Sequence, residues 1–87
     1  MTEFYTVLFT RRARKDIDRL DRTTIRRIVP VIDALAAEPR PTGCLKVRAE
    51  ERLWRIRVGD WRIGYEIDDT TREVLIIRIA HRREFYD

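Results

Sequence analysis

Arginines recur in the second half of the chain at a spacing that could gather positive charge on one surface. Arg55 and Arg57 stand two residues apart, and Arg62 follows soon after them. Guanidinium groups donate paired hydrogen bonds to phosphate and stack on bases, so such a surface suits a polyanion. Aromatic side chains could also stack on bases near such a surface: Trp54 and Trp61 beside the arginines in the sequence, and Phe85 and Tyr86 at its end.

The stretch that carries these arginines predicts a β-hairpin. Two alternating runs, Leu53 to Val58 and Trp61 to Ile67, are joined by Gly59 and Asp60. Glycine supplies the positive φ that a two-residue turn needs, so we expect these two residues to form the loop.

The hairpin register divides its side chains between two faces. Arg57 lies opposite Arg62, with Arg55 on the same face, and like charges directly opposite cost roughly 0.2–1 kcal/mol. We therefore expect this face to bind an anion that the sequence does not supply. The pairs predicted on the other face are apolar: Val58 with Trp61, Ile56 with Ile63 and Trp54 with Tyr65, which favours core packing for both tryptophans.

The first half of the chain predicts one strand and two helices. Phe4 to Phe9 is an apolar run typical of a strand, and Thr10 is a good N-cap for a helix whose apolar stripe is Ala13, Ile17 and Leu20. Asp21 to Thr24 supplies a break and a second cap, and the second helix has apolar residues at helical spacing from Ile25 to Ala36.

Three prolines lie within or directly after this second helix. Pro39 and Pro41 end it, whereas Pro30 falls inside it and predicts a kink or a helix in two parts. The short connection between the helices predicts that they pack antiparallel as a hairpin. Their basic side chains form either a nucleic-acid or protein-binding surface or an ordinary solvated face, since acidic residues are interspersed: Arg11, Arg12, Arg14, Arg22, Arg26 and Arg27.

The last strand completes the predicted sheet. Residues Val74 to Ala80 form a nearly continuous apolar run, typical of a strand buried on both faces, and we expect it to be the middle strand. Strict alternation places Leu75, Ile77 and Ile79 against the helices. The same alternation places Val74, Ile76, Arg78, Ala80 and Arg82 on the open face.

The predicted fold is α+β, with helices on one face of a four-stranded sheet. Its order is an N-terminal strand, a two-helix hairpin and a three-stranded antiparallel meander, with the first strand parallel to the last. On the open face, Arg55, Arg57, Arg62, Arg78 and Arg82 are expected to line one concave surface.

Length and composition indicate one small folded domain over residues 1–87. The net charge of +4 favours polyanionic partners, and a single cysteine, Cys44, excludes an intrachain disulfide. Cys44 is either a partly buried filler or a nucleophile, and the former is favoured. The sequence has no paired metal-ligand spacing, so no metal and no cofactor are expected. It also lacks a signal peptide and a membrane span, which predicts a cytoplasmic protein that does not bind membranes.

Residues 45–86 resemble the RelE/ParE toxin superfamily, and RelE-type mRNA endonucleases in particular. The resemblance rests on LWRIRVGDWRIGYEID, the last strand VLIIRIA and the ending HRREFY, with the helix hairpin upstream. It implies a toxin that enters the ribosomal A site and cuts mRNA through attack of a ribose 2′-hydroxyl on the adjacent phosphate. It also implies a co-encoded antitoxin that wraps the toxin, which is a monomer and forms hetero-oligomers with it.

The resemblance also implies roles for single residues. Arg62 matches the arginine that stabilises the transition-state phosphate, Arg82 matches one near the leaving group, and Tyr86 matches a tyrosine that orients or activates the 2′-hydroxyl. We expect Arg62→Ala to abolish toxicity and to leave the fold intact. The remaining substrate-binding candidates are basic: Arg55, Arg57, Arg78 and Lys46.

The general base is an open question. Arg55 and Arg57 match positions that are lysines in the best-known members, and arginine stays charged and cannot exchange protons at physiological pH. Tyr86, whose pKa nearby arginines would lower, and His81 are candidates, and Glu84 is a further one. Alternation places His81 on the core side, so its role could be in packing and not in catalysis. Phe85 and Tyr86 either stack on a base or close over the sheet.

Two other functions compete with the endonuclease. A ParE-like inhibitor of DNA gyrase would share the fold and act by binding protein without catalysis of its own. A basic RNA-binding module would keep the arginine surface and lack the chemistry. The arginine cluster with its terminal tyrosine favours the endonuclease, since a gyrase inhibitor has no stated need for it.

Overall fold

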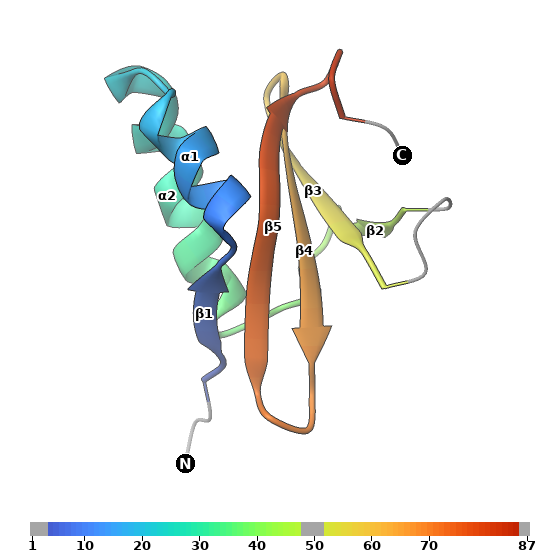
Figure 1. Cartoon of the computed structure of the whole chain (residues 1–87). Coiled ribbons are helices and arrows are strands. Elements are labelled where there is room, and N and C mark those ends of the chain that lie inside the picture. The colour runs from blue at the N-terminus through green and yellow to red at the C-terminus, as the bar shows by residue number, and fades with distance from the viewer. Residues whose placement is uncertain (1–3, 48–51, 86–87) are drawn as a thin grey trace.

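A computed structural model describes residues 4–47 and 52–85 as a curved β-sheet with two helices on one face (Figure 1). The strands are β1 (Thr6–Phe9), β2 (Leu45–Lys46), β3 (Trp54–Val58), β4 (Trp61–Asp68) and β5 (Glu73–His81). The helices are α1 (Arg11–Asp18) and α2 (Arg22–Leu35). The predicted α+β class and element order are therefore confirmed.

The sheet order is β1-β5-β4-β3-β2. β1 is parallel to β5 and the β3-β4-β5 meander is antiparallel, as predicted. The sheet has five strands and not four, because the two residues of β2 pair with Arg55 and Trp54. This added edge strand makes β4 the central strand, so the prediction that β5 is central was wrong.

Both helices begin where the sequence predicts. The Thr10 hydroxyl accepts a hydrogen bond from the Ala13 backbone N–H at 3.0 Å, and an Asp21 carboxylate oxygen accepts one from the Thr24 N–H at 2.7 Å. Such side chains satisfy backbone donors that the first helical turn leaves without a partner. α2 continues as one helix through Pro30, so the prediction of a helix in two parts was wrong.

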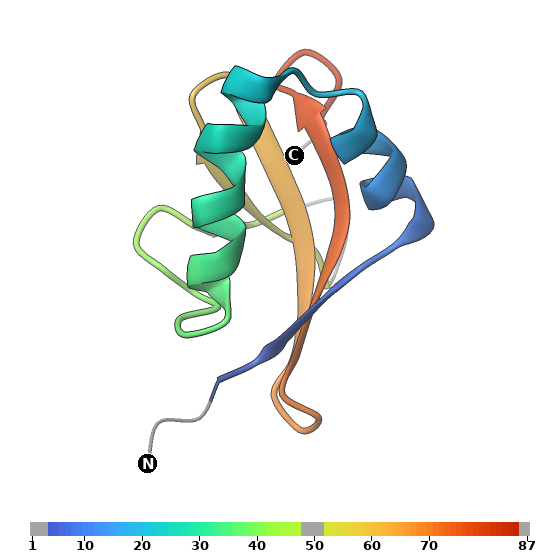
Figure 2. The same ribbon diagram turned by 90° about the vertical axis from the view of Figure 1, so that its left-hand side faces the viewer.

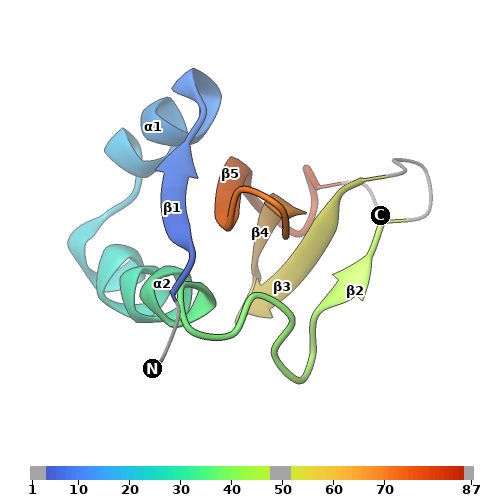
Figure 3. The same ribbon diagram turned by 90° about the horizontal axis from the view of Figure 1, so that it is seen from below.

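The two helices run in opposite directions, as a helix hairpin should, and diverge over the sheet (Figure 2). Each makes its main contacts with strands, α1 with β5 and β1, and α2 with β1 and β3. Figure 3 shows the helices on the same side of the curved sheet. The helix hairpin is therefore held mainly by contacts of each helix with the sheet. The predicted packing of one helix on the other contributes less.

The main hydrophobic core lies between the helices and the sheet. Ala13, Ile28 and Leu35 from the helices pack with Ile63 and Tyr65 of β4. Burial raises the pKa of the Tyr65 phenol well above its usual range, and the neighbouring Cys44 adds to this effect. The phenol therefore stays protonated and donates a hydrogen bond to the Pro39 carbonyl at 2.9 Å. Cys44 is partly buried, as predicted for a filler.

β5 does not alternate as the sequence predicts. Tyr65 pairs with Ile76 and Gly64 with Arg78, which leaves Ile77 as the extra residue of a β-bulge. Val74 and Ile76 therefore face the helices with Ile79, and Ile77 faces the other side, where it packs on a second cluster. The predicted sides of the residues before the bulge were wrong, because an inserted residue inverts the alternation.

Among the described residues, no helix is long and apolar enough to cross a membrane.

Candidate nucleic-acid site

The open face of the sheet carries the arginines in two cross-strand rows. Arg57 pairs with Arg62, which pairs with Ala80 on β5. In the next row Arg55 pairs with Gly64, which pairs with Arg78. Adjacent strands lie about 4.8 Å apart, so the guanidinium groups of the first row start from neighbouring backbones. Arg78 follows the β5 bulge and lies on the face that alternation predicted for it.

Arg62 is the most buried of these arginines, with 9% of its surface exposed. Its Nη1 donates hydrogen bonds to the carbonyl oxygens of Gly59 and Trp61, each at 3.1 Å. These bonds fix the guanidinium against the hairpin turn. Arg62 therefore has a structural contact that the sequence did not reveal, so its removal should lower stability somewhat. The expectation that Arg62→Ala leaves the fold intact stays a prediction.

Arg82 reaches the same turn from the end of β5. Its backbone N–H donates a hydrogen bond to the Asp60 carbonyl at 2.7 Å, and its Nε lies 3.7 Å from an Asp60 carboxylate oxygen. Both side chains are more than half exposed, so this ion pair contributes little to stability. The backbone bond sets the position of Arg82, and the Gly59-Asp60 turn brings Arg62 and Arg82 together.

The backbone conformation of this turn favours glycine at position 59. Its φ is +60°, which glycine adopts without the cost that a Cβ brings. A Cβ at this position would also lie 2.5 Å from Nη2 of Arg27, a residue of α2. Arg27 thus lies against the turn from the helix side. No spacing in the sequence distinguishes Arg27 from the other cations of the two helices.

Phe85 covers the middle of the open face. It is buried and packs with Val47 and Leu53 in the second hydrophobic cluster. A Cβ on Gly64 would lie 3.0 Å from its ring, and the Arg78 guanidinium carbon lies 4.3 Å from the ring centroid. Of the two interpretations of Phe85, closing over the sheet is the one observed. Tyr86 lies outside the described residues.

Two candidates are not brought to the arginine face. Lys46 pairs with Trp54 and its amine lies 5.8 Å from that ring, on the opposite side of the sheet from Arg55. His81 packs edge-on against Trp61, with ring centroids 5.7 Å apart, and its Nδ1 accepts the Arg83 backbone N–H at 3.3 Å. His81 therefore packs on the core side of the sheet, where the alternation of β5 placed it.

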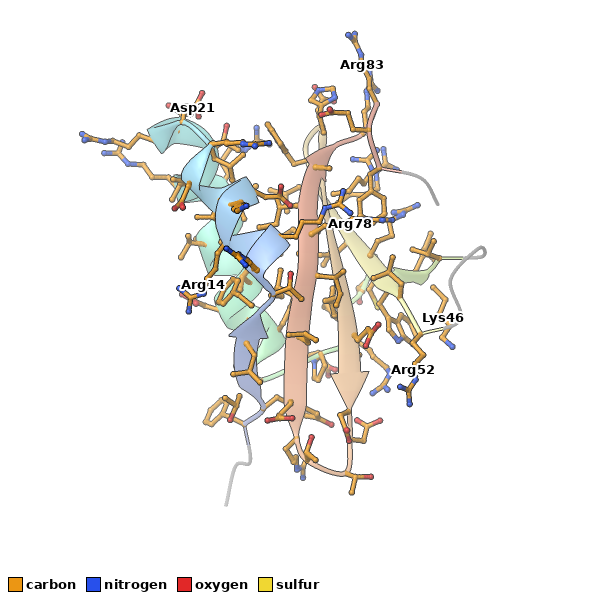
Figure 4. All side chains as sticks on the ribbon, viewed as in Figure 1. Arg14, Asp21, Lys46, Arg52, Arg78 and Arg83 are labelled. Atoms are coloured by element: carbon orange, nitrogen blue, oxygen red, sulfur yellow. The ribbon has the colours of Figure 1, made fainter. Side chains whose placement is uncertain are left out.

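Figure 4 shows how the charged side chains are distributed, with Arg78 on the face that carries the second cluster and Lys46 beyond β3. Arg57 is exposed, whereas Arg55 and Arg78 are partly buried. In the part of the chain that the structure describes, no group of three His, Cys, Asp or Glu side chains could hold a metal ion. The site as described is a cationic surface built on rigid strands, and arginine can bind and stabilise anions without exchanging protons.

Comparison with known proteins agrees with this geometry. Residues 7–86 match a family described as the ParE toxin of the type II toxin-antitoxin system parDE. The chain is 34% identical over 83 residues to Toxin RelG of Mycobacterium tuberculosis, which covers 94% of this chain and 95% of that protein.

Solved structures show the same fold. The RelBE2 toxin-antitoxin complex of Mycobacterium tuberculosis contains a chain with 33% identity and a TM-score of 0.80, covering 91% of this chain and 99% of that chain. The archaeal RelE-RelB complex of Pyrococcus horikoshii has 26% identity and a TM-score of 0.79, covering 98% and 100% respectively.

Proposed function

The chain belongs to the RelE/ParE superfamily of toxins of type II toxin-antitoxin systems, and from this premise we propose that it is a ribosome-dependent mRNA endonuclease. It acts in the ribosomal A site, in the cytoplasm, and so inhibits translation. Its partners are the ribosome, mRNA and a cognate antitoxin. The toxin is a monomer that forms hetero-oligomers with the antitoxin, as solved RelE-RelB complexes of similar chains suggest.

The observation that carries this proposal is the convergence of Arg62 and Arg82 on the Gly59-Asp60 turn, with Arg57 directly opposite Arg62. Like charges placed this close on a sheet destabilise it unless an anion lies between them. A phosphodiester that is being cleaved gains negative charge on its nonbridging oxygens, and fixed donors aimed at that charge lower the barrier. Arg62 is held by two carbonyl oxygens, so its guanidinium is already oriented and little free energy is needed to reorganise it in the transition state.

The reaction follows from this charge arrangement. The ribose 2′-oxygen attacks the adjacent phosphorus, the bond to the 5′-oxygen breaks, and the products are a 2′,3′-cyclic phosphate and a 5′-hydroxyl. The 2′-hydroxyl loses its proton to a base, and the 5′-oxygen gains one. Arg62 stabilises the phosphorane charge, Arg82 lies near the leaving oxygen, and Arg55, Arg57 and Arg78 bind flanking phosphates. An arginine cannot take up the proton of the 2′-hydroxyl, because it stays protonated. We therefore assign to Tyr86 the role of orienting or activating the 2′-hydroxyl.

The second candidate function is inhibition of DNA gyrase. It is favoured by the description of the matching family, which names the ParE toxin. The RelE-type names of the relatives and the paired arginines favour the endonuclease. A gyrase inhibitor would act through protein contact, and this action does not require guanidinium groups fixed at a hairpin turn.

Primer extension tests the choice between the two. The purified protein is incubated with a defined mRNA, with and without programmed ribosomes. Cuts at fixed codon positions that need ribosomes support the endonuclease. The Arg62→Lys variant is assayed in the same way, because it keeps the positive charge and loses the planar pair of donors. No cuts from a folded, toxic protein would reject the proposal, and inhibited supercoiling by purified gyrase would then establish the second function.

A further inference from the structure

A cleft of about 640 Å³ lies outside the arginine face, between α1 and the C-terminal end of β5. Figure 2 shows α1 beside this part of β5. β1 pairs with β5 only as far as Ile76, so beyond that residue the helix and not a strand flanks the edge. The volume is within the range of sites that enclose a small ligand. The cleft is lined chiefly by Arg11, Arg12, Lys15, Arg19, Trp61 and Ile79.

One wall of the cleft is strongly cationic. Arg11, Lys15 and Arg19 follow one another at four-residue spacing, so they stand about 6 Å apart along one side of the helix. The acidic residue among them, Asp16, accepts the Ile79 backbone N–H at 2.9 Å, which ties its carboxylate to the strand edge. Glu84 at the rim is the other acidic lining residue. The wall therefore has an excess of positive charge.

The floor of the cleft is apolar and partly aromatic. Its apolar lining residues are Leu20, Trp61, Ile79 and Ala80, and Trp61 is a partly buried residue whose other contacts are with the core. Cations beside an accessible aromatic ring are the combination that binds single-stranded nucleic acid, in which the phosphates contact the cations and a base stacks on the ring. An acidic peptide would use the cations but would have less use for a flat ring.

The cleft and the arginine face meet at the edge of β5. Ala80, which lines the cleft, is the cross-strand partner of Arg62, whereas Trp61 and Ile79 face the helix side of the sheet. An RNA chain bound at Arg62 and Arg82 would therefore reach the cleft by passing around the β5 edge at Ala80. This step rests on the proposed function, which supplies RNA as the polyanion.

We propose that the cleft between α1 and β5 is a second RNA-binding site, which holds the phosphate backbone of nucleotides that flank the cleaved bond or of ribosomal RNA beside it. Both sources present the same chemistry, an anionic phosphodiester backbone. The site binds RNA and takes no part in bond breaking. Its cations thus contribute affinity and salt dependence, whereas Arg62 and Arg82 contribute rate.

The test compares two double variants that each remove two positive charges. Arg11→Gln with Lys15→Gln removes two of the four cations that line the cleft, whereas Arg14→Gln with Arg22→Gln removes two exposed cations that do not line it. Arg14 lines a separate hollow with Phe9, Ile17 and Asp18 and is labelled in Figure 4. Loss of Arg11 at the start of α1 should not weaken that helix, whereas Lys15 lies in its last turn, where a cation stabilises it. Far-UV circular dichroism therefore checks that each variant is folded.

Binding is measured by fluorescence anisotropy with a 2′-O-methyl RNA of about ten nucleotides, which cannot be cleaved, over a range of salt concentrations. Cleavage of ribosome-bound mRNA is measured in parallel by primer extension. The cleft variant should bind this RNA roughly tenfold more weakly, with a salt slope smaller by about 1.4, since each phosphate contact on a single strand contributes about 0.7. The control pair should lose much less. Arg11→Lys with Lys15→Arg keeps the charges and should keep the affinity.

Three results would overturn the inference. Equal loss in both double variants would mean that only net charge matters. Unchanged RNA binding by the cleft variant, with loss of binding to poly-L-glutamate, would assign the cleft to an acidic protein. Unchanged binding to both would mean that the cleft holds no polyanion. If wild-type protein fails to cut ribosome-bound mRNA while the RNA-binding difference persists, the proposed function fails and the cleft assignment stands. To separate the two RNA sources, the same variants are bound to programmed ribosomes and to empty ones.

Discussion

The guanidinium of Arg78 lies over the ring of Phe85, with 4.3 Å between its central carbon and the ring centroid. This contact links the last described residue of the chain to β5. Gly64 lies beneath the same ring, and a Cβ added there would lie 3.0 Å from it, so the ring would have to shift. The arginine face is therefore supported by an apolar cluster of its own.

Phe85→Ala should destabilise the protein by roughly 3 kcal/mol, because it opens a cavity in the cluster with Val47 and Leu53. Urea unfolding measures this change. Phe85→Leu is the control, and it should retain most of the stability since it keeps an apolar side chain there. Equal, small effects of both substitutions would mean that the ring is not packed as described.

Gly59→Ala should destabilise the hairpin by about 1–3 kcal/mol, because its φ of +60° strains any residue with a Cβ. The added Cβ would also meet the guanidinium end of Arg27, a flexible side chain that can move away. Combined with Arg27→Ala, the substitution should therefore cost close to the sum of the two single changes. Thermal unfolding of the four proteins in this cycle measures the coupling, and a coupling well above about 0.5 kcal/mol would mean that Arg27 is held rigidly against the turn.

Arg62→Ala should lower cleavage by a factor of about 100–1,000, the usual loss when one preorganised donor to a transition-state charge is removed. It should also reduce stability by about 1 kcal/mol, because two hydrogen bonds to the turn disappear. Arg57→Ala is a matched control that removes the facing charge of the same row. A larger cleavage loss for Arg57→Ala than for Arg62→Ala would reverse their assigned roles.

Tyr86→Phe should reduce cleavage more than ribosome binding, because the substitution keeps the ring and removes the hydroxyl. Primer extension gives the first quantity, and co-sedimentation with ribosomes gives the second. Tyr5→Phe is a control that removes a hydroxyl elsewhere, since Tyr5 hydrogen-bonds Asp69. Equal loss of cleavage and ribosome binding in Tyr86→Phe would mean that its hydroxyl only positions the substrate.

Acid should weaken the end of the sheet opposite the arginine turn. The Arg40 guanidinium, with help from the Tyr5 hydroxyl, holds the pKa of Asp69 below its usual value. A lowered pKa in the folded state contributes stability above the unfolded pKa of about 3.9, and that contribution is lost as pH falls through the folded value. Urea unfolding between neutral pH and about pH 3 should therefore show a smaller decline for Asp69→Asn than for the wild type. Parallel declines would contradict this assignment.

Local patterns in the sequence were enough for the elements and for the hairpin. The Gly59-Asp60 turn and the alternation around it fixed the register of β3 and β4, and Thr10 and Asp21 determined where the helices begin. These features depend on neighbours a few residues away, which is why sequence spacing reveals them. The parallel pairing of β1 with β5 followed because helices between two strands require a crossover.

Tertiary structure alone decided what depends on distant neighbours. The bulge at Ile77 sets which side chains of β5 face the helices, and it exists only in pairing with β4. The contact of Arg27 with the turn, the side of the sheet that Lys46 occupies and the cleft beside α1 likewise arise from segments far apart in the chain. A sequence records that these residues are cationic, but only the fold determines which surface each one charges.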